Sequence, residues 1–123
     1  MPIPAIPNGL SPERLSRVLD FIQRSLHESI HVEALAREAG LSPFHFSRMF
    51  KRATRHTPHA FITARRMDLA CQLLAESRLE ISEVARRCGF RTQAHFTEVF
   101  RLRVGTTPKR YREGQRQKAA ETA

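Results

Sequence analysis

The sequence from Val32 to Pro58 reads VEALAREAGL SPFHFSRMFKRATRHTP, and a second version of it, ISEVARRCGF RTQAHFTEVFRLRVGTTP, runs from Ile81 to Pro108. In each copy an apolar-faced segment leads to a glycine, and a second helical segment follows. The matching positions include Val32 and Ile81, Gly40 and Gly89, Phe46 and Phe96, and Phe50 and Phe100. A repeat of this length indicates a supersecondary unit used twice. The order of helix, glycine turn and helix is that of a helix-turn-helix.

Helical spacing and capping residues extend this interpretation to the whole chain. Ser11-Pro12 predicts a helix start, because serine caps the first turn and proline lacks only an N–H that would be unbonded there. We expect a first helix from residue 11 that ends between His27 and His31, further helices over residues 32–39, 43–54, 58–76, 81–88 and 92–102, and a last short one that opens at Thr107-Pro108. Alternating apolar runs typical of strands are absent. The sequence therefore predicts an all-α chain of about seven helices.

The predicted organisation is two helix-turn-helix lobes joined by a long linker helix. We expect residues 11–57 to form the first lobe, 58–77 the linker helix and 78–114 the second lobe. Residues 1–10 are rich in proline and residues 115–123 are polar, so a flexible N-terminal arm and a flexible tail are expected at the two ends.

The charge of the chain favours a polyanionic partner. There are 21 Lys and Arg residues against 12 Asp and Glu residues, a formal net charge of +9, and the excess is concentrated from Arg86 onward. Such a field attracts nucleic acid most often. Two helix-turn-helix units in a basic chain therefore indicate double-stranded DNA as the partner.

The cysteines and the absence of targeting segments predict a cytoplasmic protein. Cys71 and Cys88 both fall on apolar faces of predicted helices, a pattern of buried thiols in a reducing compartment. No apolar run approaches membrane-spanning length, and the N-terminal MPIPAIPNGL lacks the regions of a signal peptide. We expect no membrane association.

The second helix of a helix-turn-helix packs one face on the first helix and places the opposite face in the major groove. In the helix at 43–54, the inward stripe is Phe46, Met49, Phe50 and Ala53, and the outward set is Phe44, Ser47, Arg48 and Lys51. In the helix at 92–102, Phe96, Val99 and Phe100 point inward, while Gln93, Ala94, Thr97, Glu98 and Arg101 point outward and His95 lies at the boundary. The outward sets suit thymine methyls, base edges and phosphates. The alternative is a solvated face with a stray Phe44.

Glu98 is the unusual member of these sets, because phosphates repel a carboxylate. It can accept a hydrogen bond from a cytosine amine or form a salt bridge with a neighbouring arginine, and of the two we expect the salt bridge.

No pattern in the sequence indicates catalysis, a cofactor or a metal. His27 and His31 are four residues apart, but the first predicted helix ends between them, and no cysteine or carboxylate set joins them. There is no phosphate-binding loop, dinucleotide fingerprint, or arrangement of Ser or Cys with His and Asp. We expect a protein that is not an enzyme.

The second copy closely resembles the signature of the AraC/XylS family of bacterial transcription regulators. The matching residues are Ala85, Gly89, Phe90, Phe96, Phe100, Gly105, Thr107, Pro108, Tyr111 and Arg112. The first copy, through AREAGLSPFHFSRMFKRAT, resembles the family's other motif, and the resemblance covers residues 11–113. It implies two lobes joined by a long helix over Pro58–Glu76, whose recognition helices enter successive major grooves of duplex DNA.

The resemblance also implies site residues. The family's base contacts carry over to Phe44, Ser47 and Arg48 in the first lobe, and to Gln93, Ala94, His95, Thr97 and Glu98 in the second. The cations on or beside this face, expected to neutralise phosphates, are Arg48, Lys51, Arg101, Lys109, Arg110 and Arg112. Two residues depart from the family pattern: Glu98 stands where a basic residue is usual. Arg55 stands where a glycine usually ends the first recognition helix, and its partner in the repeat is Gly105.

We therefore expect a sequence-specific transcription regulator that binds DNA as a monomer, with RNA polymerase as a further candidate partner. The chain has no room for an effector-binding domain, and it resembles the small stand-alone members of the family. Three alternatives stay open. The chain could be the separated DNA-binding half of a larger effector-responsive regulator, a non-specific architectural DNA binder, or a module that binds RNA polymerase alone.

Overall fold

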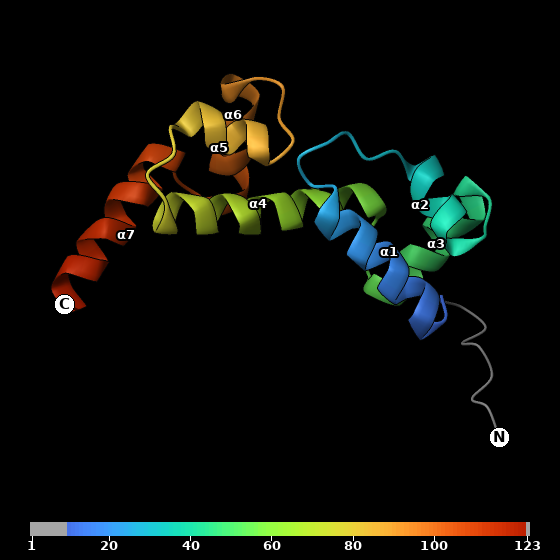
Figure 1. The fold of residues 1–123 in the computed structure, drawn as a ribbon. Coiled ribbons are helices and arrows are strands. Elements are labelled where there is room, and N and C mark those ends of the chain that lie inside the picture. Colours follow the sequence, from blue (N-terminus) through green and yellow to red (C-terminus); the bar gives the residue numbers. More distant parts are fainter. Residues whose placement is uncertain (1–9, 123) are drawn as a thin grey trace. The chain divides into compact units, whose positions relative to one another are not determined.

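The structure is a computed structural model that describes residues 10–122, and within that range the chain forms helices and turns but no strand (Figure 1). The helices are α1 (Pro12–Arg24), α2 (Val32–Ala39), α3 (Pro43–Thr54), α4 (Pro58–Glu76), α5 (Ile81–Arg87), α6 (Gln93–Val104) and α7 (Pro108–Thr122). The predicted all-α fold with about seven helices is confirmed. Of the arm expected over residues 1–10, residues 1–9 lie outside the described range. Leu10 is buried and belongs to the folded part.

The chain divides into two compact units inside α4, between residues 64 and 65. In the first unit α1 packs on α2 and α2 on α3, and in the second α5 packs on α6 and α6 on α7. The helix predicted as a linker contributes to both cores. Its N-terminal half places Phe61 edge-on against Phe50, with ring centroids 5.4 Å apart. Its C-terminal half places Met67, Ala70 and Leu74 in the core of the second unit.

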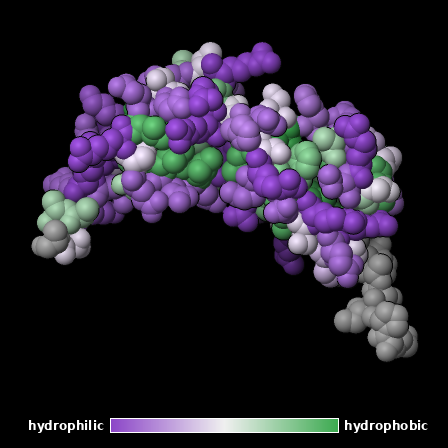
Figure 2. All heavy atoms as spheres, viewed as in Figure 1, coloured by the Kyte–Doolittle hydropathy of each residue, from purple (hydrophilic) through white to green (hydrophobic). Residues whose placement is uncertain are grey.

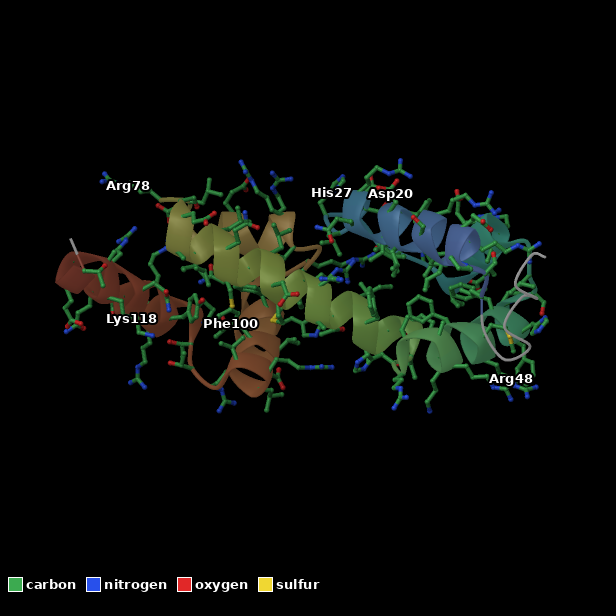
Figure 3. The ribbon with its side chains drawn as sticks, turned by 90° about the horizontal axis from the view of Figure 1, so that it is seen from below. Asp20, His27, Arg48, Arg78, Phe100 and Lys118 are labelled. Carbon is green, nitrogen blue, oxygen red and sulfur yellow. The ribbon has the colours of Figure 1, made fainter. Side chains whose placement is uncertain are left out.

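Equivalent phenylalanines form the centre of each unit. Phe46 and Phe50 on α3 are fully buried with ring centroids 5.5 Å apart, and Phe96 and Phe100 on α6 are fully buried at 5.7 Å. Each pair lies four residues apart, so both rings project from one side of the helix. Figure 3 shows Phe100 on the side of α6 that faces α4. The predicted inward stripes are therefore confirmed at their aromatic positions.

The turn between the two helices of each helix-turn-helix depends on a left-handed glycine. Gly40 has φ 71° and Gly89 has φ 84°, a region that glycine enters without steric cost. The chain can then reverse, and the N–H of Leu41 donates to the carbonyl of Ala36 at 2.9 Å. The second unit has the equivalent bond at 3.0 Å. This pattern satisfies carbonyls at the end of the first helix that would otherwise be unpaired.

A side-chain cap starts each second helix. The hydroxyl oxygen of Ser42 accepts from the N–H of His45 at 3.2 Å, and that of Thr92 accepts from the N–H of His95 at 3.1 Å. An N-cap of this kind contributes about 1 kcal/mol to helix stability. The two caps begin α3 and α6 at the same point of the repeat.

The cysteines are packing residues of the second unit. Both Cys71 and Cys88 are free thiols; Cys88 is fully buried and Cys71 is half-buried. Burial raises the pKa of the Cys88 thiol to about 12, so this thiol stays protonated near neutral pH.

No helix in the described part of the chain is long and apolar enough to cross a membrane.

The last helix is longer than the sequence predicted. α7 continues to Thr122, through most of the segment expected to be a flexible tail. The expectation of a flexible tail rested on polarity, but residues 115–122 contain Gln, Arg, Lys, Ala and Glu and neither Gly nor Pro. These residue types have high helix propensity, so the helix continues without a packed face.

α3 ends on a left-handed residue that carries a side chain. Arg55 has φ 66° and ψ 12°, and its N–H donates to the carbonyl of Lys51 at 2.7 Å. It is the only non-glycine residue with positive φ among residues 10–122. At the equivalent end of α6 stands Gly105, with φ 97°. A Cβ in this region costs roughly 1–2 kcal/mol, so the Arg55 position is strained.

Replacing Arg55 with glycine should relieve this strain. We expect Arg55→Gly to raise the free energy of unfolding by roughly 0.5–1 kcal/mol, after the entropy that glycine adds to the unfolded chain. Denaturant unfolding followed by circular dichroism measures the change. Arg37→Gly is the matched control, because Arg37 is exposed inside α2 and the same replacement there should cost about 1 kcal/mol. A lower stability for Arg55→Gly would contradict the strained cap.

Candidate nucleic-acid interface

The outward face of α3 combines an aromatic ring with a cation. Phe44 is 75% exposed, whereas Leu102 is the only other large apolar residue of the described chain that is exposed. The guanidinium carbon of Arg48 lies 5.8 Å from the centroid of the Phe44 ring, within cation–π range. Figure 3 shows Arg48 on the outer side of the first unit. The cation and the ring therefore lie together on the exposed face of α3.

The outward face of α6 is a shallow depression. Its lining residues are Gln93, Ala94, Thr97, Glu98 and Arg101, the set that the sequence predicted to face outward. All are exposed except Thr97, which is half-buried. His95 lies beside them with its ring edge-on to Phe90, at a centroid distance of 5.3 Å. The turn residue Phe90 thus holds His95 at the boundary of this face.

The two outward faces match at two positions of the repeat and differ at others. Small hydroxyl residues, Ser47 and Thr97, share one position of the repeat, and the cations Lys51 and Arg101 share another. At two further positions α3 has Phe44 and Arg48, and α6 has Ala94 and Glu98. Each recognition helix therefore presents its predicted outward residues on one face, but the two faces differ in shape and charge.

The cations of these faces have no carboxylate partner. Within residues 10–122, none of Arg48, Lys51, Arg101, Lys109 and Arg110 lies within 4.0 Å of an acidic oxygen. Ion pairs are formed instead on α1, α4 and α5 and in the turn after α1. Hydrophilic side chains cover most of the surface visible in Figure 2. The positive charge of the faces is therefore available to an external anion.

The salt bridge expected for Glu98 is not formed. No arginine or lysine nitrogen of the described residues lies within 4.0 Å of its carboxylate, although Arg101 follows it by three positions. Glu83 has the same spacing to Arg86 and does form the pair, at 2.6 Å, with its side chain 30% exposed. Glu98 is exposed, so a pair with Arg101 would contribute little to stability.

Arg112 does not join the outward cations. Its Nε donates to the carbonyl of Leu74 at 3.0 Å and its Nη1 to the carbonyl of Leu79 at 2.6 Å. Leu74 lies in the last turn of α4, where carbonyls lack partners within the helix. Arg112 therefore bonds through its guanidinium to the end of α4 and to the connection from α4 to α5, and its predicted phosphate contact stays a prediction. The repeat has Ile62, an apolar buried residue, at the equivalent place.

The half-buried position of Arg112 is costly for a charged group. Burial lowers the pKa of its guanidinium, neighbouring Arg116 lowers it further, and Glu80 acts in the opposite direction. Its Nη2 is buried without a hydrogen-bond partner in the described chain. The two hydrogen bonds to carbonyls offset this cost. Sequence reasoning assigned Arg112 to the surface because nothing local distinguishes it from the neighbouring cations.

The helices after each recognition helix begin with the same cap. The hydroxyl oxygen of Thr57 accepts from the N–H of Ala60 and that of Thr107 from the N–H of Arg110, each at 3.2 Å. This cap places exposed Lys109 in the first turn of α7. Helix N-termini with nearby cations favour anions such as phosphate.

In the described residues, no group of three or more His, Cys, Asp or Glu side chains could hold a metal ion.

Comparison with known proteins gives consistent matches. A family model described as a helix-turn-helix domain matches residues 35–114. The probable transcriptional regulator LumQ of Photobacterium leiognathi is 40% identical over 101 residues, which are 80% of this chain and 41% of LumQ. The multiple antibiotic resistance protein MarA of Escherichia coli K12 is 34% identical over 95 residues, which are 77% of this chain and 75% of MarA.

Solved structures agree with these matches. The DNA-binding domain of AdpA, a global transcriptional factor crystallised with a target DNA, has a TM-score of 0.81 and 34% identity, covering 85% of this chain and 95% of that domain. A DNA-binding transcriptional dual regulator from Escherichia coli K-12 has a TM-score of 0.77 and 29% identity, covering 89% and 98%. The chain spans only 41% of LumQ, so most of that relative lies outside the match.

The interior role of Arg112 predicts a loss of stability on its removal. We expect Arg112→Ala to lower the free energy of unfolding by about 2 kcal/mol, because two carbonyls lose charged donors. Lys109→Ala, at an exposed cation on the same helix, should change stability by less than about 0.5 kcal/mol. Denaturant titration of both variants measures the difference. Equal stabilities would mean that the Arg112 hydrogen bonds contribute nothing.

Proposed function

The chain belongs to the AraC/XylS family of helix-turn-helix transcription regulators, and on this premise we propose that it recognises specific sequences in duplex DNA through α3 and α6. One recognition helix of each unit enters a major groove of the same duplex. The family and the fold are those of DNA-binding regulators, and we propose that the chain has no enzymatic role of its own.

The observation that carries the proposal is the duplicated outward face. In each unit, two buried phenylalanines orient the recognition helix, and a set of polar, aromatic and charged residues faces outward. The cations at the ends of these faces, Lys51 and Arg101, are unpaired within the described chain and suit phosphates. The exposed Phe44 ring with Arg48 suits a thymine methyl next to a guanine.

The duplication also supports a single chain per site. Most helix-turn-helix proteins dimerise to present two recognition helices, whereas this chain carries both. We therefore propose that it binds an asymmetric site as a monomer. We also propose that it acts in the cytoplasm, where bacterial DNA is found, and that RNA polymerase is its partner in regulating transcription.

Selection of bound fragments from random duplex DNA tests the proposal. We expect one asymmetric consensus that outcompetes bulk DNA by at least about 10³-fold. Light scattering of the complex on one consensus site should give one chain per duplex. Equal affinity for every sequence would indicate an architectural DNA binder, and no DNA retention would indicate a module that binds protein. Two chains on a palindromic consensus would contradict the monomer.

The unpaired cations predict a steep dependence of affinity on salt. The logarithm of the association constant should fall linearly with the logarithm of salt concentration, by about 0.9 for each phosphate neutralised. Lys51→Ala and Arg101→Ala should each reduce this slope by about 0.9. Arg24→Ala is a control with the same change in charge, since Arg24 pairs with Asp20 on α1 at 3.0 Å. A flat response in the unaltered protein would contradict the interface.

A further inference from the structure

The two recognition faces carry opposite charges at one position of the repeat. Arg48 on α3 and Glu98 on α6 occupy the same place, and both are exposed. Glu98 is the only acidic residue in either recognition helix. The inward phenylalanines are the same in both units, so the helices present these two side chains from equivalent orientations. At this position the two faces therefore differ in the charge of the side chain and not in its orientation on the helix.

The Glu98 carboxylate has no donor inside the described chain. Glu83 on α5 shows what an engaged carboxylate looks like: Arg86 donates to both of its oxygens, at 2.9 and 2.6 Å. These hydrogen bonds, assisted by Arg87, lower the pKa of the Glu83 carboxyl to about 2. Glu98 has no such bond, despite Arg101 three residues later. Both carboxylate oxygens of Glu98 can therefore accept a hydrogen bond from a donor on a bound partner.

Of the base edges in the major groove, only one offers a hydrogen-bond donor that suits the Glu98 carboxylate. In the major groove, guanine presents only the acceptors N7 and O6, and thymine presents the acceptor O4 with a methyl group. Adenine has a donor at N6, but the adjacent N7 acceptor repels a carboxylate. Cytosine presents the N4 amine, which is the donor that Glu and Asp accept from. A carboxylate on this face therefore favours cytosine over the other three bases.

The surroundings of Glu98 leave space for a base edge. Where α3 has the Phe44 ring, α6 has Ala94, and Glu98 lies in the shallow depression with Gln93 and Thr97. Arg101, on the same depression, supplies a cation that counters the repulsion between Glu98 and phosphates.

We propose that Glu98 is a specificity-determining residue that selects a C·G pair by accepting a hydrogen bond from the cytosine N4 amine. Arg48, at the same position of the first unit, selects guanine. At two different positions of the DNA site, the first unit would then contact the guanine of a G·C pair through Arg48, and the second unit would contact the cytosine of another through Glu98. This inference rests on the proposed sequence-specific binding of DNA.

Selection from random DNA with matched variants tests the role of Glu98. The unaltered chain should enrich a cytosine at one position, and replacing that C·G pair should weaken binding on the order of tenfold. In Glu98→Ala the replacement should no longer matter, and the rest of the consensus should stay. Glu98→Gln should shift the preference at that position toward adenine, whose N6 and N7 pair with an amide. Arg48→Ala should relax a different position, at a guanine.

Glu76→Ala controls for the loss of a negative charge, because Glu76 is exposed in the second unit outside the recognition face. It should keep the cytosine preference. The proposal is overturned if Glu98→Ala keeps that cytosine and binds every sequence more tightly, since Glu98 would then only repel phosphates. If the unaltered chain enriches no sequence at all, the proposed function itself fails. Circular dichroism of each variant checks that the helices are intact.

Discussion

The burial of two phenylalanines, four residues apart on each recognition helix, is the constraint on which both units depend. Phe46 and Phe50 on α3, and Phe96 and Phe100 on α6, are completely removed from solvent. Each fully buried ring contributes roughly 1.5–3 kcal/mol, far more than any surface ion pair of the chain. Because both rings project from one side, their burial sets the rotation of the helix about its axis. The opposite side must then face outward.

This division separates stability from recognition. The inward aromatic residues are the same in both copies, but the outward residues Phe44 and Arg48 of α3 are replaced by Ala94 and Glu98 on α6. The outward side chains make few contacts with the core, so they can change without a large cost in folding free energy. One scaffold can therefore carry two recognition surfaces of different charge, which is how a single chain would read an asymmetric DNA site.

The two copies also differ inside. At one position the first unit buries Ile62, and the second places Arg112, whose guanidinium bonds to carbonyls of Leu74 and Leu79. At another, the first recognition helix ends on a strained arginine, Arg55, and the second on Gly105. Both differences concern the ends of helices, where backbone groups lack helical partners. A repeated sequence thus keeps its core and adjusts its helix termini locally.

The sequence alone determined the repeat, the all-α class and the division of each recognition helix into two faces. These features follow from local chemistry: helical spacing, glycine turns, and Ser, Thr and Pro at helix starts. Only the tertiary structure showed that Arg112 points inward, that Glu98 has no partner within the described chain, and that α4 contributes to both cores. Each of these depends on which groups distant in sequence come within hydrogen-bonding or packing distance. The sequence does not distinguish an exposed arginine from a half-buried one such as Arg112, and only the folded chain brings the carbonyls of Leu74 and Leu79 to its guanidinium.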